Sequence, residues 1–210
     1  MSVPALTLIT PELSAEEIER RVRCALAYER SERIAVQLRA RHLSDGERAR
    51  VGGVLAELCR VRGAALIVNA DLELARALDA DGVQLPERGP SVEHAHAVLP
   101  PGRLIGASRH DAEGARAAAL AGASFVLLAP VYDVPGKGPP LGIAGLRRIA
   151  AASTVPVIAL GGIDQSRVAE VAAAGAAGIA VMREVFEAPD LALASSELLA
   201  ALDAARSRAP

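Results

Sequence analysis

Short, almost wholly apolar runs alternate with longer amphipathic runs along the chain. The short runs lack a polar alternation, which is typical of strands buried on both faces of a parallel sheet. The longer runs have the 3.6-residue period of helices. Eight strands are expected, at Ala5–Ile9, Ile34–Leu38, Ala64–Val68, Gly82–Leu85, Leu104–Ala107, Phe125–Leu128, Val155–Leu160 and Gly178–Met182.

Helices are expected between and after these strands. They cover Ala15–Tyr28, Gly46–Val61, Leu72–Leu78, Val92–Leu99, Ala112–Ala121, Gly145–Ala152, Gln165–Ala174 and Leu191–Ala205. Side chains that cap helix N-termini precede several of them, namely Ser14 (with Glu17 at capping-box spacing), Ser91, Asp111 and Asp164. Glycines that can end a helix stand before several strands, at Gly63, Gly122 and Gly175.

Strict alternation of strands and helices predicts a parallel sheet with right-handed crossovers. Eight such repeats favour closure into a (β/α)8 TIM barrel over an open doubly wound sheet, which would usually be longer. We expect one domain over residues 1–210, because a chain of this length can bury a full core.

Composition narrows the picture further. Hydrophobic residues make up 51% of the chain, aromatic residues only 2%, and Trp is absent, so the core is expected to be aliphatic. A net charge of −2 gives no field that favours nucleic acid or an anionic membrane. No signal-peptide or membrane-spanning pattern is seen, and we expect a cytoplasmic protein. Cys24 and Cys59 are expected to be buried, reduced thiols, and alanine-rich helix faces leave a homo-oligomer possible.

Polar and cationic residues recur at or just beyond the carboxyl ends of the expected strands. In chain order they are Gln37, Arg39, Arg41, Asn69, Gln84, Glu87, Ser108, His110, Tyr132, Lys137, Gly161, Gly162 and Arg183. In a TIM barrel these positions share the rim on which active sites lie. Gly161 and Gly162 let the backbone approach a ligand closely, and the helix start after them favours a phosphate.

Several of these residues have two interpretations. His110 is either a general acid/base or a surface histidine at the start of a helix. Lys137 lies in a Pro/Gly-rich loop and either meets an anionic substrate or stays solvated. Arg39 is expected to contact a phosphate or carboxylate, whereas Arg41 contacts the same group or is a solvated charge. Asn69 either hydrogen-bonds a ligand or caps the next helix.

Taken in order, the motifs resemble the thiamine phosphate synthase/TenI family over essentially the whole chain. The matching segments are Leu8–Thr10, Gln37–Arg41, Ile67–Asn69, Ala80–Leu85, Gly106–His110, Pro130–Tyr132 with Lys137, Pro156–Ile163 and Gly178–Met182. The order and spacing of the segments together carry the resemblance.

The resemblance implies a TIM barrel that handles a phosphorylated thiazole in thiamine biosynthesis, with the phosphate over Gly161 and Gly162. The synthase branch joins that thiazole to a hydroxymethylpyrimidine diphosphate and releases pyrophosphate with the help of Mg²⁺. The TenI branch tautomerises a thiazole carboxylate phosphate, and for it we expect no cofactor. His110 would then carry the proton and Arg39 would orient the carboxylate. Further substrate contacts are expected from Gln37, Arg41, Asn69, Ser108, Lys137, Met182 and Arg183.

Departures from the synthase pattern decide between the branches. Ala70 and Gly89 stand where the pattern has metal-binding aspartates, and Asp71 and Glu87 are nearby but out of register. Arg183 replaces a serine, and either binds phosphate or blocks the pocket. We therefore expect TenI-type tautomerisation. A divergent synthase, a non-catalytic thiazole or thiamine phosphate-binding regulator and another phosphate-binding barrel are the alternatives.

Overall fold

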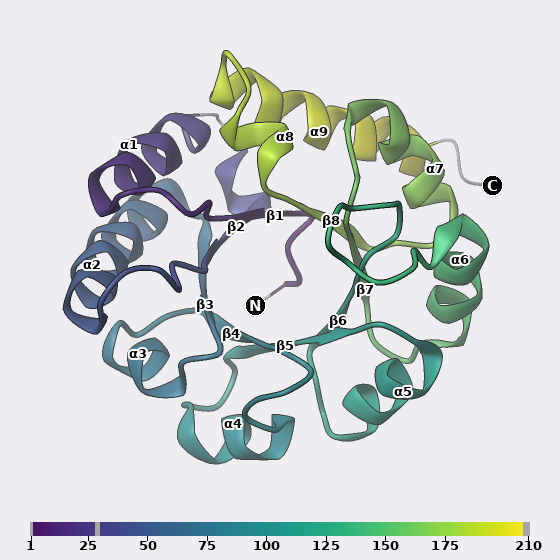
Figure 1. Cartoon of the computed structure of the whole chain (residues 1–210), viewed down its shortest axis with the longest axis horizontal. Coiled ribbons are helices and arrows are strands. Elements are labelled where there is room, and N and C mark those ends of the chain that lie inside the picture. The colour runs from purple at the N-terminus through teal and green to yellow at the C-terminus, as the bar shows by residue number, and fades with distance from the viewer. Residues whose placement is uncertain (1, 28–29, 208–210) are drawn as a thin grey trace.

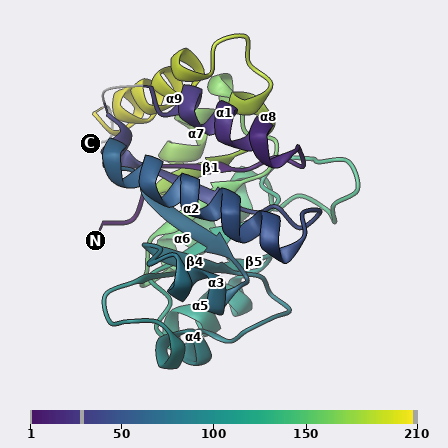
Figure 2. The ribbon, with the colours of Figure 1, turned by 90° about the vertical axis from the view of Figure 1, so that its left-hand side faces the viewer.

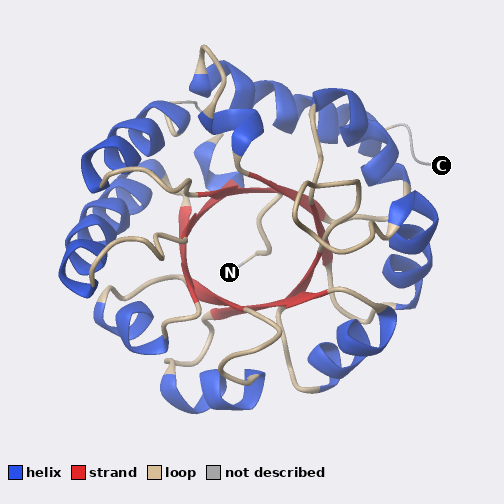
Figure 3. Cartoon of the chain, in the orientation of Figure 1, coloured by secondary structure: helices blue, strands red, loops and turns tan. Residues whose placement is uncertain are grey.

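Eight parallel strands form a closed ring in sequence order, with β1 paired to β8, in a computed structural model that describes residues 2–27 and 30–207. The helices surround this ring (Figure 1, Figure 3), and the predicted TIM barrel is confirmed. The strands are β1 Leu6–Ile9, β2 Ile34–Leu38, β3 Ala65–Asn69, β4 Gly82–Leu85, β5 Leu104–Arg109, β6 Phe125–Leu128, β7 Val157–Leu160 and β8 Gly178–Val181.

The α-helices follow the predicted runs with shifts at their ends. They are α1 Ala15–Ala25, α2 Asp45–Arg62, α3 Leu72–Ala77, α4 Val92–Val98, α5 Ala112–Leu120, α6 Gly142–Ala152, α7 Val168–Ala173, α8 Arg183–Phe186 and α9 Leu191–Arg206, with 3-10 turns η1 Ser31–Arg33 and η2 Gln165–Arg167. The predicted helix over Gln165–Ala174 is therefore split, and α8 was not expected. Tyr28, the predicted end of the first helix, lies outside the described residues. In the described part of the chain, no helix is long and apolar enough to cross a membrane.

Helix caps explain several of these starts. Ser91, Asp111 and Asp164 each accept a backbone N–H as predicted. Ser14 also caps its helix, but the carboxylate of Glu17 binds two arginines of α1, so the capping box expected there is wrong. The reciprocal pair instead joins Ser44 and Glu47 at the start of α2.

Two layers of apolar side chains fill the molecule. Inside the ring lie Ile9, Ala35, Ile67, Leu104, Phe125, Leu127, Ile158 and Ala180. The alternate strand residues point outward and pack against the helices, so both faces of each strand are buried and the strand sequences read as apolar throughout. The described N-terminal segment lies over one end of the ring (Figure 1, Figure 2), where Val3 packs against the interior cluster.

The two thiols are free, and they have different environments. Cys59 in α2 is buried, and burial raises the pKa of its thiol to about 12. Cys24 is exposed, so its predicted burial is wrong. The buried side of α1 is formed by Ile18, Val22 and Ala25, and Cys24 lies beside that stripe rather than within it.

Asp203 ties α9 to the segment before β2. Its Oδ2 accepts bonds from Arg33 Nη1 at 2.8 Å and from Arg30 Nη1 at 2.6 Å. The Arg33 bond is the largest cause that lowers the pKa of Asp203 from 3.8 to about 2. A lowered folded-state pKa contributes stability that is present above the unfolded value and is lost as the pH falls through about 2.

We therefore expect Asp203→Asn to lower the free energy of unfolding at neutral pH but to have little effect near pH 2. Urea unfolding of both proteins across this pH range measures the difference. A difference that does not change with pH would contradict the assignment of this ion pair.

Candidate active site

A cavity of about 860 Å³ opens at the carboxyl ends of the strands. It brings together almost every residue predicted for the site. Its lining includes Gln37, Arg39, Arg41, Asn69, Glu87, Ser108, His110, Lys137, Gly161, Gly162, Met182 and Arg183. Of the predicted substrate and metal residues Asp71 lies outside it, as do Gln84 and Tyr132 among the predicted rim positions. His110 and the glycine pair do share one rim.

Two buried glutamines support the side chains at the base of this cavity. Gln37 Nε2 donates to Asn69 Oδ1 at 3.1 Å, and Gln84 Nε2 donates to Ser108 Oγ at 2.9 Å. Within the described chain no group donates to Gln37 Oε1, which is buried. A buried acceptor without a partner costs about 1–3 kcal/mol.

The end of β2 forms a cationic edge of the cavity. The side chain of Arg39 is 23% exposed, and its backbone N–H donates to Thr10 Oγ1 at 2.8 Å. Burial, and then the positive charge of Arg41, lower the pKa of Arg39, which remains charged. Glu12 is the carboxylate that partly compensates this charge, at 4.0 Å. This edge is therefore suited to an anionic ligand.

His110 is oriented by a backbone carbonyl. Its Nδ1 contacts the carbonyl oxygen of Ala129, which only accepts hydrogen bonds, so Nδ1 carries a proton. Nε2 faces the cavity side, where Glu87 Oε2 lies 4.0 Å away. In the neutral ring this Nε2 is a proton acceptor, which is the state that general base chemistry requires.

The turn after β7 exposes bare backbone to the cavity. Gly161 and Gly162 have φ angles of +103° and +65°, which other residues rarely adopt. A Cβ on Gly162 would lie 2.8 Å from Tyr132 Cβ, because the β6–α6 loop packs on this turn (Figure 1). Tyr132 N donates to Gly161 O at 3.0 Å. The expected helix start here is the 3-10 turn η2, so the glycine backbone itself is the main candidate for phosphate contact.

Arg167 joins three segments around this turn, and sequence reasoning missed it. Its Nη1 donates to the carbonyl oxygen of Gly162, and its guanidinium lies 4.4 Å from the centre of the Tyr132 ring. Tyr132 Oη donates to Glu170 Oε2 at 2.8 Å. Burial and then this bond raise the pKa of Tyr132 to about 12, so the phenol remains a donor at neutral pH.

Arg167→Gln is expected to raise KM for a phosphorylated substrate about tenfold with little change in kcat, because the glycine turn loses its anchor. Steady-state kinetics measure this split. Tyr132→Phe keeps the ring under the guanidinium and removes only the bond to Glu170, so it is expected to have a smaller effect. A KM unchanged in Arg167→Gln would show that the arginine does not position the turn.

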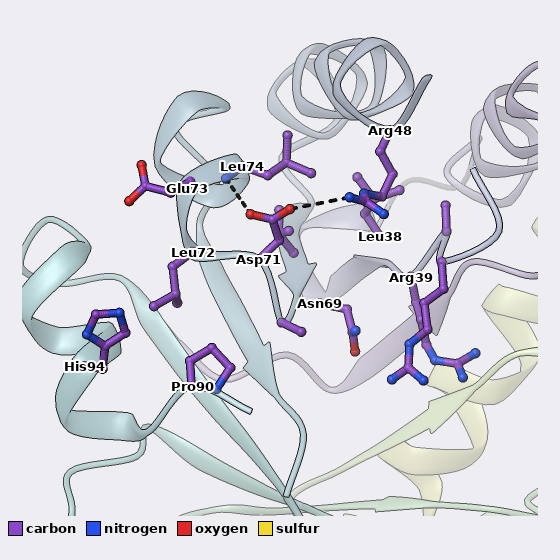
Figure 4. Close-up of a pocket in the computed structure, with 14 residues that line it drawn as sticks. Leu38, Arg39, Arg48, Asn69, Asp71, Leu72, Glu73, Leu74, Pro90 and His94 are labelled. Atoms are coloured by element: carbon purple, nitrogen blue, oxygen red, sulfur yellow. Dashed lines mark hydrogen bonds and ion pairs between the residues drawn. The ribbon is translucent and has the colours of Figure 1, made fainter. Parts of the chain in front are cut away.

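The Mg²⁺ that a synthase implies has no fitting ligand set here. Asp71 lies beside a second cavity of about 440 Å³, where its carboxylate caps α3 through Leu74 N at 2.9 Å and faces Arg48 Nη2 at 3.8 Å (Figure 4). The side chains of Asn69 and Arg39 point away from the Asp71 carboxylate (Figure 4). Across the described residues no cluster of three or more His, Cys, Asp or Glu side chains is arranged to hold a metal ion. The alternative in which Asn69 caps α3 is wrong, because Asp71 does so.

A closed eight-stranded barrel with a cationic edge and a glycine turn at one mouth defines a TIM barrel whose strand ends form a cavity suited to a small anionic ligand. The chain belongs to the thiamine monophosphate synthase family, whose sequence profile matches residues 6–185. The family resemblance read from the motifs is confirmed, and the chain is an enzyme of thiamine biosynthesis.

Two of the relatives and one solved structure match over most of their length. A thiamine-phosphate synthase from Methanoregula boonei is 40% identical over 167 residues, which cover 78% of this chain and 77% of the relative. One from Salinispora arenicola is 36% identical over 205 residues, covering 96% and 98%. The solved structure of a thiamine phosphate pyrophosphorylase from Pyrococcus furiosus superimposes with a TM-score of 0.84 at 32% identity, covering 95% of this chain and 96% of that one.

Proposed function

We propose that this chain couples a thiazole phosphate to hydroxymethylpyrimidine diphosphate and forms thiamine phosphate. The sequence analysis placed this reaction second, and the names of the relatives favour it over tautomerisation. The observation that carries the proposal is that one cavity has two separate ends suited to anions, one with two arginines and one with bare glycine backbone. The arginine edge lies at β2 and the glycine turn at β7, which are separated across the ring (Figure 1). A coupling enzyme has to hold two phosphorylated substrates at once.

The reaction assigns a task to each end. The thiazole nitrogen donates its lone pair to the methylene carbon of the pyrimidine, while the bond from that carbon to the diphosphate oxygen breaks. Pyrophosphate leaves with the electron pair. In this scheme Gly161 and Gly162 hold the thiazole phosphate, and Arg39 and Arg41 face the diphosphate. Positioning two reactants side by side removes most of the entropic barrier.

Incubation of the protein with both substrates tests the proposal. Thiamine phosphate and pyrophosphate are expected in equal amounts, with no product when either substrate is omitted. The assay is run in EDTA and in Mg²⁺. Binding of thiazole phosphate without product in either buffer would reject the coupling reaction and favour a non-catalytic regulator that binds thiazole phosphate.

Tautomerisation is the second candidate, and the orientation of His110 favours it. An imidazole with Nδ1 fixed by Ala129 O and Nε2 at the cavity can move a proton on a bound ring. Thiazole carboxylate phosphate would then isomerise without the pyrimidine, and His110→Ala would abolish the reaction while substrate binding remained. Isomerisation without coupling would decide for this candidate.

A further inference from the structure

The part of the rim where the family pattern places metal-binding carboxylates is neutral in this chain. Ala70 follows β3 with a φ of +66°, and Gly89 has no side chain. The two nearby acids are engaged elsewhere. Asp71 caps α3 and faces Arg48, and Glu87 stands beside His110. Mg²⁺ demands oxygen ligands in near-octahedral geometry, and this rim does not supply them.

Positive charge is instead concentrated at the adjacent end of β2. Arg39 and Arg41 both line the cavity, and the carboxylate that pairs with Arg39, Glu12, has a side chain that is 62% exposed. The acidic residues of the cavity come from the segments after β4, β6, β7 and β8, and they are Glu87, Asp133, Asp164, Glu184 and Glu187. The cavity as a whole contains both signs of charge, but its β2 edge is cationic.

Two arginines can provide what a divalent ion provides to a diphosphate. Each guanidinium is permanently charged and binds phosphate oxygens through paired N–H groups. Two neutral donors, on β3 and β5, line the same cavity. Asn69 Oδ1 is taken by Gln37, so the amide presents its Nδ2 group, and Ser108 Oγ accepts from Gln84, so its hydroxyl proton can be donated.

We propose that this chain binds the diphosphate end of its pyrimidine substrate directly through Arg39 and Arg41, without a divalent ion. This inference rests on the coupling reaction proposed above. When the carbon–oxygen bond breaks, the electron pair remains on the diphosphate oxygen, and the two guanidinium groups stabilise the added negative charge. The thiazole nitrogen supplies the pair for the new bond, so no other reactant is needed.

Calorimetric titration of the full chain with inorganic pyrophosphate tests the inference. Binding is expected in excess EDTA, with an affinity of the same order as in excess MgCl₂. Arg39→Gln and Arg41→Gln are each expected to weaken binding at least about tenfold. Arg62→Gln, an exposed position at the far end of α2, is the matched control and is expected to bind as the wild type does. Circular dichroism verifies that each variant is folded.

Pyrophosphate binding that appears only with Mg²⁺, and that Glu87→Gln then weakens, would overturn the inference. Coupling assayed in the same two buffers separates this outcome from failure of the proposed function. Product formed only with Mg²⁺ would refute the metal-free site and leave the synthase intact. Pyrophosphate bound in EDTA with no product in either buffer would reject the synthase and leave the arginine site standing.

Discussion

Gly161→Ala is expected to lower kcat/KM for the proposed substrate, thiazole phosphate, by about a hundredfold or more. A Cβ at this position would lie 2.9 Å from both Cα and Cβ of Pro130, and the φ of +103° is itself unfavourable for alanine. The turn and the β6–α6 loop have to separate, and a displacement of about 1 Å at a substrate-binding turn is enough for such a loss. Steady-state kinetics with varied thiazole phosphate measure it.

Gly102→Ala is the matched control for this substitution. Gly102 has a φ of +86°, so alanine is similarly strained there, but no atom lies within 4 Å of the added Cβ. It precedes β5 at the opposite end of the barrel from the cavity. We expect a modest loss of thermal stability and normal kinetics. Equal kinetic losses in the two variants would show that backbone strain, and not the glycine turn, controls activity.

Gly82→Ala is expected to destabilise the fold by about 3 kcal/mol or more. Gly82 is paired with Leu104 in the β4–β5 ladder, and an added Cβ would meet the Leu104 carbonyl oxygen and lie 2.7 Å from its Cβ. The contact is with a neighbouring strand of a closed ring, so no flexible side chain can move aside. Urea unfolding followed by circular dichroism measures the free energy of unfolding.

Gly53→Ala is expected to stabilise the fold, in contrast to Gly82→Ala. Gly53 lies exposed in the interior of α2, and nothing is found within 4 Å of an added Cβ. Alanine is favoured over glycine in a helix by about 0.5–1 kcal/mol, so the free energy of unfolding is expected to rise by that amount. A similar loss for Gly53→Ala and Gly82→Ala would contradict the steric argument.

The barrel could be predicted because strands that are buried on both faces have almost wholly apolar sequences. The strand ends were less predictable. β5 continues through Ser108 to Arg109. Backbone hydrogen bonds between strands do not depend on whether the side chains are polar, so the end of the apolar run did not mark the end of the strand. β7 begins only at Val157, two residues after the predicted start. The four-residue helix α8 is too short for any periodic pattern to reveal it.

The membership of the site was also largely predictable, because strand ends converge in a barrel whatever the side chains are. The contacts between side chains were not. Arg167 precedes an ordinary amphipathic helix, so its sequence context suggests a solvated charge. In the structure its guanidinium stacks on Tyr132, which belongs to the β6–α6 loop. Asp71 is two residues from Asn69, but the chain has already turned into α3, and its carboxylate belongs to that helix. Such contacts depend on tertiary geometry that local spacing does not encode.

The described N-terminal segment lies at the end of the barrel opposite the cavity (Figure 2). Val3 packs there against the apolar side chains that fill the ring, so a ligand approaches the candidate site from the other end. For the two-substrate reaction proposed above, a shared entrance makes the order of binding matter. The substrate that binds deeper has to enter first, and the group above it has to leave before it can.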